Sequence, residues 1–138
     1  MPVISEKFGV KTKGYSDIID ITASVEEIIS KHKNKNAQAL VYVSGSTASI
    51  TTMEYEPGLL KDLNDAFETI APTEKIYHHD TSWEEGNGLA HVRASILGTA
   101  ISLPIVNNLL VLGTWQQIVL IDFDNKPRTR SVVVQIIY

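Results

Sequence analysis

The sequence predicts an α+β fold built as one domain that spans residues 1–138. Strand-like and helical stretches are interspersed in the first part of the chain, and a run of strands separated by turn signals follows, an order typical of α+β proteins. No linker, repeat or low-complexity segment divides the chain. Its length is enough to bury a core, and 43% apolar with 20% charged residues is a globular composition.

The N-terminal half combines strands with two helices. Thr22 or Ser24 is expected to cap the first helix, because Ser24 and Glu27 have the spacing of a capping box. Pro57 and Gly58 should break the chain before the second helix, whose apolar residues recur at helical spacing. The expected elements are strands at 3–13, 17–21 and 38–43, a strand or a loop leading into one at 46–54, a helix after residue 24, and a helix at 59–70.

The C-terminal half is expected to consist mostly of antiparallel strands. Residues 71–88 are polar and end in a glycine-rich turn, and a helix follows that Gly98 should stop. Asn107 with Asn108, and later residues 124–127, supply turns between strands. The expected elements are a helix at 89–97 and strands at 100–105, 109–112, 116–123 and 131–137.

Charge and cysteine content argue against several classes of partner and site. The net charge is −4 and Lys and Arg form no long run, so we expect no nucleic-acid partner. Without cysteine there is no disulfide, thiolate nucleophile or cysteine-based zinc site. The first residues lack the apolar stretch of a signal peptide, and no apolar run approaches the ~20 residues that span a bilayer, so we expect no membrane partner and a cytoplasmic location.

Four histidines are candidates for acid–base chemistry or metal binding, because imidazole titrates near neutral pH and is a common metal ligand. His32 lies in a lysine-rich helix end and is expected at the surface. His79, which follows His78, is twelve residues before His91, a spacing that matches no compact metal motif. On spacing alone, a shared site for His79 and His91 and two separate surface positions both remain open.

Two stretches could bind an anion. Arg128 and Arg130 alternate around Thr129, so they share a strand face and could hold a phosphate or carboxylate, or be ordinary edge charges. Ser46 and Thr47 begin a hydroxyl-rich stretch that could bind phosphate or simply bond internally. No Lys-Ser/Thr pair follows the glycine there, so a Walker-type nucleotide loop is not supported.

Glu54, Asp62 and Trp115 carry little signal on their own. Glu54 and Asp62 lie at the edges of apolar elements, where an acid is usually solvated or paired. Trp115 follows Gly113, which in a strand often marks a bulge, and a lone Trp there is more often a core residue than a ligand contact.

Together, these residues are similar in order and spacing to the YjbQ-like family, also known as secondary thiamine-phosphate synthases and long regarded as uncharacterised. The resemblance covers essentially the whole chain and is strongest from Val41 onward. Its most specific parts are Gly-Thr-Trp-Gln at 113–116 and Asn87-x-x-x-His91. The other matching pieces are 45–54, Asp62, 77–80, 86–91, Gly98, Pro104 and 128–130.

The resemblance implies an α+β fold dominated by a two-layered, sandwich-like antiparallel β structure, assembled as a homotrimer. It also implies that polar residues meet in a pocket at or near the subunit interface. Carried over singly, Glu54, His79, Asn87 and His91 match the family's site positions, and Arg130 matches its final arginine.

One histidine of the family does not carry over. Where the family usually has His-Thr-Thr/Ser-Ala, this chain reads Gly-Ser-Thr-Ala from Gly45 onward, which indicates a subgroup lacking that histidine and leaves room for a larger ligand. A three-histidine zinc site needs three protein ligands. His79 and His91 remain, with Glu54 or Asp80 as possible oxygen ligands, so a bound Zn²⁺ or Mg²⁺ stays an open alternative.

The activity that the resemblance implies is of the thiamine-phosphate synthase type, joining a pyrimidine diphosphate to a thiazole phosphate with release of pyrophosphate. One of the two histidines would act as general acid or base, and cationic groups would stabilise the departing diphosphate. The expected catalytic residues are His79, His91, Glu54 and Asn87. The expected substrate contacts are Arg128, Arg130, Ser46, Thr47, Trp115 and Tyr77.

Two further hypotheses use the same residues. One is a metal- or acid–base-assisted hydrolase, and the other is a trimeric, non-catalytic module that binds a phosphorylated or anionic metabolite. The missing histidine at Gly45 favours the versions of these hypotheses that need no metal.

Overall fold

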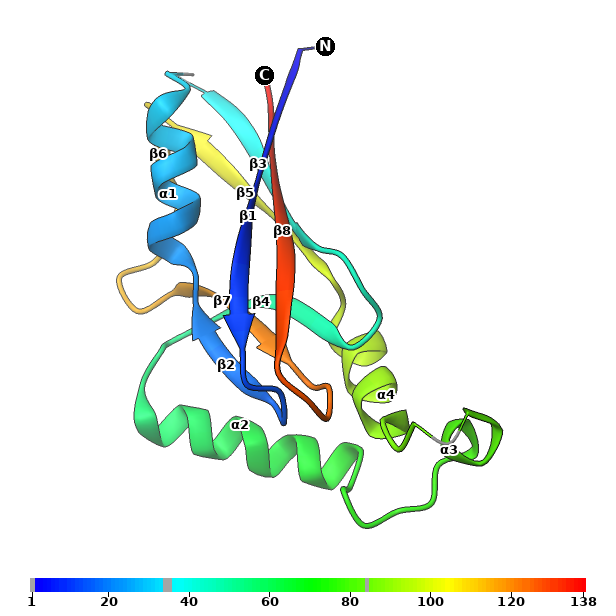
Figure 1. Ribbon diagram of the computed structural model, residues 1–138. Coiled ribbons are helices and arrows are strands. Elements are labelled where there is room, and N and C mark those ends of the chain that lie inside the picture. Colours follow the sequence, from blue (N-terminus) through cyan, green and yellow to red (C-terminus); the bar gives the residue numbers. More distant parts are fainter. Residues whose placement is uncertain (1, 34–35, 84) are drawn as a thin grey trace.

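The computed structural model describes residues 2–33, 36–83 and 85–138. Figure 1 shows the elements, with β1 and β8 side by side so that the two chain ends lie together. The elements are β1 (Val3–Thr12), β2 (Asp17–Asp20), α1 (Thr22–Lys31), β3 (Asn36–Val43), β4 (Ala48–Met53), α2 (Pro57–Ile70), α3 (His78–Trp83), α4 (Gly88–Leu97), β5 (Ala100–Val106), β6 (Leu109–Leu110), β7 (Gln117–Asp122) and β8 (Arg128–Ile137).

The strands form two antiparallel sheets. The larger sheet has the order β1-β8-β3-β5-β6, and the smaller has the order β2-β7-β4. β8 is central to the larger sheet because it pairs with β1 on one side and with β3 on the other. These sheets and the few helices confirm the α+β class with a largely antiparallel β structure.

The main core lies where the larger sheet faces the smaller sheet and α1. Alternation in β3 and β8 sends every second side chain inward, as expected for strands with one covered face. Helix α1 adds three apolar side chains from one stripe, Val25, Ile28 and Ile29. The sheet residues of this core include Ala39, Val41, Val43, Ile50, Ile118, Leu120, Val132, Val134 and Ile136.

A second core lies on the opposite face of the smaller sheet. Val119 and Ile121 of β7 pack there against Phe67 of α2 and against Ala90 and Ala94 of α4. β7 is therefore buried on both faces, which explains its uninterrupted apolar run. The helices α2 and α4 thus add a third layer beneath the two sheets, and α4 brings its first turn to the end of β7 (Figure 1).

The helix starts differ from the sequence-based expectation. α1 begins at Thr22 without a side-chain cap, so the capping box from Ser24 does not form; the Asp20 carboxylate accepts from the Thr22 N–H instead. Pro57 does not break the chain but starts α2, where Glu56 accepts from two backbone N–H groups. Proline suits this position because its missing N–H has no partner in the first helical turn.

Other differences concern the second half. The polar segment 71–88, for which no element was predicted, contains the short helix α3, and the strand expected at 109–112 is limited to Leu109–Leu110. β8 begins at Arg128, three residues before the expected strand, because Arg128 and Arg130 pair with Thr12 and Val10 of β1. Among the described residues, no helix is long and apolar enough to cross a membrane.

Candidate functional site

Helices α3 and α4 bring His79 and His91 together. Their ring centroids are 4.4 Å apart and the planes are inclined by 36°. The approach depends on Gly88, the first residue of α4: a Cβ atom there would lie 2.6 Å from the Tyr77 Cβ and 2.9 Å from an Asp80 carboxylate oxygen. The two imidazoles are therefore in direct contact, although they are twelve residues apart in the sequence.

Asp80 fixes one member of this pair. Its Oδ1 lies 3.2 Å from the Nδ1 of His79 and accepts a 2.8 Å hydrogen bond from the Gly88 backbone N–H. A carboxylate only accepts hydrogen bonds, so this contact places a proton on Nδ1 and leaves Nε2 for another partner. Asp80 therefore ties the imidazole of His79 to the first turn of α4.

His91 lies in an environment that disfavours its charged form. Burial lowers the pKa of His91, and the neighbouring His79 lowers it further. The negative charges of Asp124, Glu85 and Asp80 oppose this effect only in part. The pKa of His91 is consequently below its usual 6.5, and the side chain is mostly neutral at pH 7.

The two imidazoles line a cavity of about 330 Å³. This volume lies in the range of small-molecule sites. Its walls are contributed by the end of α2, the segment that leads into α3, the start of α3 and the first turns of α4. The lining residues are Ile70, Lys75, Ile76, Tyr77, His78, His79, Gly88, His91 and Val92.

Asn87 precedes Gly88 in the chain but does not line this cavity, and its side chain belongs to a second polar cluster. It is 5% exposed, and its amide donates a 3.2 Å hydrogen bond to Asp124. Its own Oδ1 is the buried side-chain polar atom that lacks a partner among the described residues. An unpaired buried acceptor costs about 1–3 kcal/mol, and such atoms are few in folded proteins.

The second cluster is a buried ion pair at the end of β7. Arg130 binds both oxygens of Asp122, at 2.7 and 2.8 Å, and donates a 2.6 Å bond to Thr47. Thr12 donates to the same carboxylate. Burial acts to raise the pKa of Asp122, but the bonds from Arg130 and Thr12 outweigh it and keep the pKa below its usual value.

Asp124 extends this cluster toward the surface. Its Oδ2 accepts a 2.7 Å bond from Arg128 and a 3.2 Å bond from Thr47. Burial by itself raises the pKa of Asp124, but hydrogen bonds from the Asn125 N–H, Asn87 and Arg128 outweigh it and lower the pKa to about 2. Each arginine thus faces a buried carboxylate, so the cluster of two arginines and two aspartates is close to neutral.

Gly45 does not leave free space next to this cluster. A Cβ atom at Gly45 would lie 2.9 Å from Nη1 of Arg130, and its φ of +121° suits glycine. The expected room for a larger ligand is therefore taken up by the Arg130 guanidinium. Ser46 is exposed beside it, whereas Thr47 is buried.

Glu54 and Trp115 lie apart from the histidine pair. Glu54 follows the far end of β4, and β4 starts directly after Thr47, so at about 3.3 Å per residue the two lie about 20 Å apart. Trp115 is 72% exposed in the loop before β7, close to this far end, where Gln117 pairs with Met53. Within the described residues, the histidine cavity therefore contains His79 and His91, with Asn87 at the start of the same helix as His91, and without Glu54 or Trp115.

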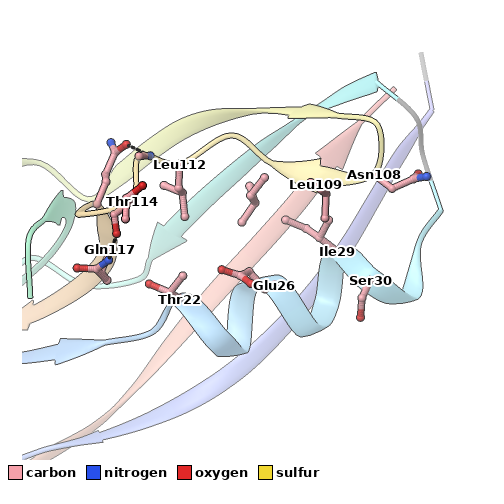
Figure 2. A pocket seen from close by; sticks show the side chains of 12 residues that line it. Thr22, Glu26, Ile29, Ser30, Asn108, Leu109, Leu112, Thr114 and Gln117 are labelled. Carbon is pink, nitrogen blue, oxygen red and sulfur yellow. Dashed lines mark hydrogen bonds between the residues drawn. The ribbon is translucent and has the colours of Figure 1, made fainter.

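A larger cavity of about 440 Å³ lies elsewhere, between α1 and the segment from β6 to β7 (Figure 2). Ile29, Leu109 and Leu112 give it apolar walls, and Thr22 and Thr114 lie toward one end. Glu26 is the titratable side chain among its described lining residues. The histidine-lined cavity is smaller, but its wall holds more side chains that can transfer protons, so it is the better candidate for a catalytic site.

The described residues do not fit a metal centre. No group of three or more His, Asp or Glu side chains within 2–33, 36–83 and 85–138 is arranged to hold an ion. Asp80 could complete a set with the two imidazoles, but it is already bonded to His79 and to the Gly88 N–H. A Zn²⁺ site needs three protein ligands and an open position, and the described residues place two imidazoles here without a free third ligand.

Sequence reasoning did not identify Asp122 and Asp124 as part of the site. The sequence offers one signal, because Asp122 directly follows the apolar run 118–121; its burial, at 0% exposed, is visible only in the structure. A buried carboxylate at such a position needs a cationic partner. Arg130 provides this partner from β8, a strand of the other sheet.

Comparisons with known proteins agree with this structure. The UPF0047 protein of Archaeoglobus fulgidus is 37% identical over 91% of this chain and 95% of that protein. UPF0047 protein YugU of Bacillus subtilis is 35% identical over 91% and 93%. The crystal structure of a YbjQ-like protein of unknown function from Sulfolobus solfataricus superposes with a TM-score of 0.92 at 32% identity, over 98% of this chain and 96% of that one. A family model described as UPF0047 protein YjbQ-like matches residues 6–138, and the chain belongs to this family.

Proposed function

We propose that this chain is an acid–base hydrolase of small phosphate esters, with His91 as general base and His79 as general acid. The observation that carries the proposal is the contact between two imidazoles, 4.4 Å apart, in the wall of a cavity of suitable size. Enzymes that cleave esters without a metal or a covalent intermediate need one group to accept a proton and another to supply one.

The environments of the two histidines suit these different roles. His91 has a lowered pKa and is mostly neutral at pH 7, which is the form that accepts a proton from water. His79 carries a proton on Nδ1, held by Asp80, and its Nε2 is left to donate when the ring is charged.

Lys75 supports a phosphate ester rather than a neutral ester. It lines the same cavity, and its Nζ lies 5.4 Å from the centroid of the Tyr77 ring. Attack of water on phosphorus concentrates negative charge on the non-bridging oxygens, which a nearby ammonium group stabilises.

The thiamine-phosphate synthase-type transfer is the second candidate. Arg128, Arg130 and Thr47 gather at the end of β7, and Asn87, the N-cap of the helix that carries His91, donates to Asp124 of this cluster. Against it, both arginines are paired with buried carboxylates, so a diphosphate would meet a nearly neutral cluster. Incubation with Mg²⁺, the pyrimidine diphosphate and the thiazole phosphate should yield thiamine phosphate if this candidate is correct.

The hydrolase proposal is tested with purified protein and p-nitrophenyl phosphodiesters. His91→Asn should lower kcat by about 10²- to 10⁴-fold, the usual contribution of a general base. His79→Asn should matter little for p-nitrophenolate, which leaves without protonation, and strongly for an alkoxide leaving group. This split between leaving groups identifies the acid.

His32→Asn is the matched control, because His32 lies at the end of α1, where it contacts Glu6 and not the cavity. It should retain wild-type activity. Equal activity of His91→Asn and the wild type would refute the role of His91. Ligand binding without any turnover of the phosphodiesters would instead favour the non-catalytic binding module.

A further inference from the structure

Large aliphatic side chains surround the histidine cavity at the surface. Ile76 is 84% exposed, Ile70 57% and Val92 38%, and all three line the cavity. They come from three separate segments: the end of α2, the segment before α3, and α4. Exposed aliphatic residues that converge on one hollow mark a binding surface, whereas single ones scattered over a protein need no explanation.

A cation lies in the same wall. Lys75 directly precedes Ile76, and its Nζ lies over the Tyr77 ring, whose face attracts a positive charge. Among the described lining residues, Lys75 is the side chain that is cationic regardless of the protonation of the histidines. The cavity therefore presents an apolar surface and one fixed positive charge to the same ligand.

From this arrangement we propose that the substrate is an amphipathic phosphate ester, whose apolar substituent lies against Ile70, Ile76 and Val92 and whose phosphate faces Lys75. The inference rests on the proposed hydrolase function and specifies its substrate class. A small molecule suits a concave cavity of about 330 Å³ that has reactive groups in its wall.

The chemical step needs no co-reactant besides water. His91 takes a proton from water, whose oxygen forms a bond to phosphorus. The bond from phosphorus to the leaving oxygen breaks, and His79 donates a proton to that oxygen. A diester is thereby converted into a monoester and an alcohol, and solvent exchange returns both imidazoles to their starting state.

The first measurement varies only the apolar substituent. A series of p-nitrophenyl phosphodiesters with methyl, ethyl, butyl and phenyl as the second substituent keeps the leaving group constant. Burial of each added methylene should raise kcat/KM by up to about fourfold. A kcat/KM that does not change along the series would overturn the inference while leaving the hydrolase intact.

A second measurement does not depend on turnover. Binding of methyl-, butyl- and phenylphosphonate, which are not hydrolysed, is measured by calorimetry. Tighter binding of the butyl and phenyl compounds supports the substrate class even if the phosphodiesters are not cleaved, in which case only the proposed reaction fails. Equal affinity for all three would overturn the inference.

Matched variants locate the binding surface. Ile76→Ser and Val92→Ser should weaken phenylphosphonate binding several-fold and leave methylphosphonate binding nearly unchanged. Ile96→Ser is the control, because Ile96 is 62% exposed on the same helix as Val92 but does not line the cavity. An equal effect of Ile96→Ser would overturn the assignment of the apolar substituent.

The cationic contact is separated in the same way. Lys75→Gln should weaken the binding of all three phosphonates by a similar factor, whereas Lys61→Gln, on the exposed side of α2, should not.

Sedimentation of Ile76→Ser gives the remaining check. A change of oligomeric state in this variant would show that the aliphatic rim covers a second copy of the chain, and it would overturn the inference.

Discussion

At the scale of single residues, the structure separates charges that fix the fold from groups that are free to react. Arg130 was expected to bind an anion, but its guanidinium is held by the buried carboxylate of Asp122. His79 and His91, by contrast, line a cavity with their imidazole rings. The sequence predicted these residues as site candidates but not all of their contacts, because Arg130 binds Asp122 and Thr47 from 8 and 83 residues away and His79 contacts His91 across twelve residues.

The pH dependence of stability should report Asp124. Its pKa is about 2 in the folded chain and 3.8 in an unfolded one, so the folded state prefers the charged form. The contribution, about 2 kcal/mol, is fully present above about pH 5 and is lost as the pH falls toward 2. Urea unfolding at several pH values should show the advantage of wild type over Asp124→Asn shrinking across this window. A constant difference would contradict the assignment, and exposed Asp62→Asn serves as the control.

The pH dependence of activity should report His91. A general base works only when it is unprotonated, and burial places the pKa of His91 below 6.5. The logarithm of kcat/KM should therefore fall with decreasing pH through a midpoint below 6.5 and be flat just above it. Histidine resonances followed by NMR should show the same midpoint for His91. A midpoint above 6.5 would mean that another group acts as the base.

At the scale of elements, alternation and helical periodicity predicted most strands and helices, and errors occurred where one residue has two meanings. A proline such as Pro57 can interrupt the chain or occupy the first turn of a helix. Here the carboxylate of Glu56 accepts hydrogen bonds from the N–H groups of Gly58 and Leu59, and this cap stabilises a helix that starts at Pro57. α3 was missed because its six residues are polar and contain no repeated apolar stripe. Its position comes from contacts with α4, which are tertiary.

Gly88→Ala tests the packing of α3 on α4. The added Cβ would overlap Tyr77 and press on Asp80, so α4 has to move away and His79 and His91 separate. Overpacking of this kind costs about 1–3 kcal/mol. Separation should also move the pKa of His91 toward 6.5, because its contact with His79 is lost.

Gly9→Ala is the matched control for this prediction. A Cβ atom there would lie 3.5 Å from a methyl group of Thr129, an ordinary contact. Its stability should stay within about 0.5 kcal/mol of wild type, and its His91 titration should not change. If Gly88→Ala behaved like Gly9→Ala in both measurements, close packing at Gly88 would not position the histidine pair.

At the scale of the whole molecule, the outward residues of β3, β5 and β8 in the larger sheet carry no charge, whereas Lys7 and Lys11 of the edge strand β1 point to the same face. Tyr42 lies between Val133 and Ala100 within the uncharged part of this face. Charged residues are depleted in the centres of protein interfaces, so an uncharged sheet face suits association with another copy. The outward residues of β3, β5 and β8 are Asn36, Gln38, Leu40, Tyr42, Ala100, Ser102, Pro104, Val106, Thr129, Ser131, Val133, Gln135 and Ile137.

We propose that the expected homotrimer forms through this face, and Tyr42→Lys tests it. Tyr42 is 39% exposed, so the change should leave the fold intact but place a charge in the interface, where it is costly to desolvate. Sedimentation at micromolar concentration should give three times the 15.3 kDa of one chain for wild type and a smaller particle for Tyr42→Lys. Ile96→Lys, on α4, should remain trimeric. Dissociation of the α4 variant alone would place the interface at the helices, and a wild-type particle of 15.3 kDa would refute the trimer.

Because association stabilises the folded chain by mass action, the melting temperature of wild type should also rise with protein concentration, and that of Tyr42→Lys should not.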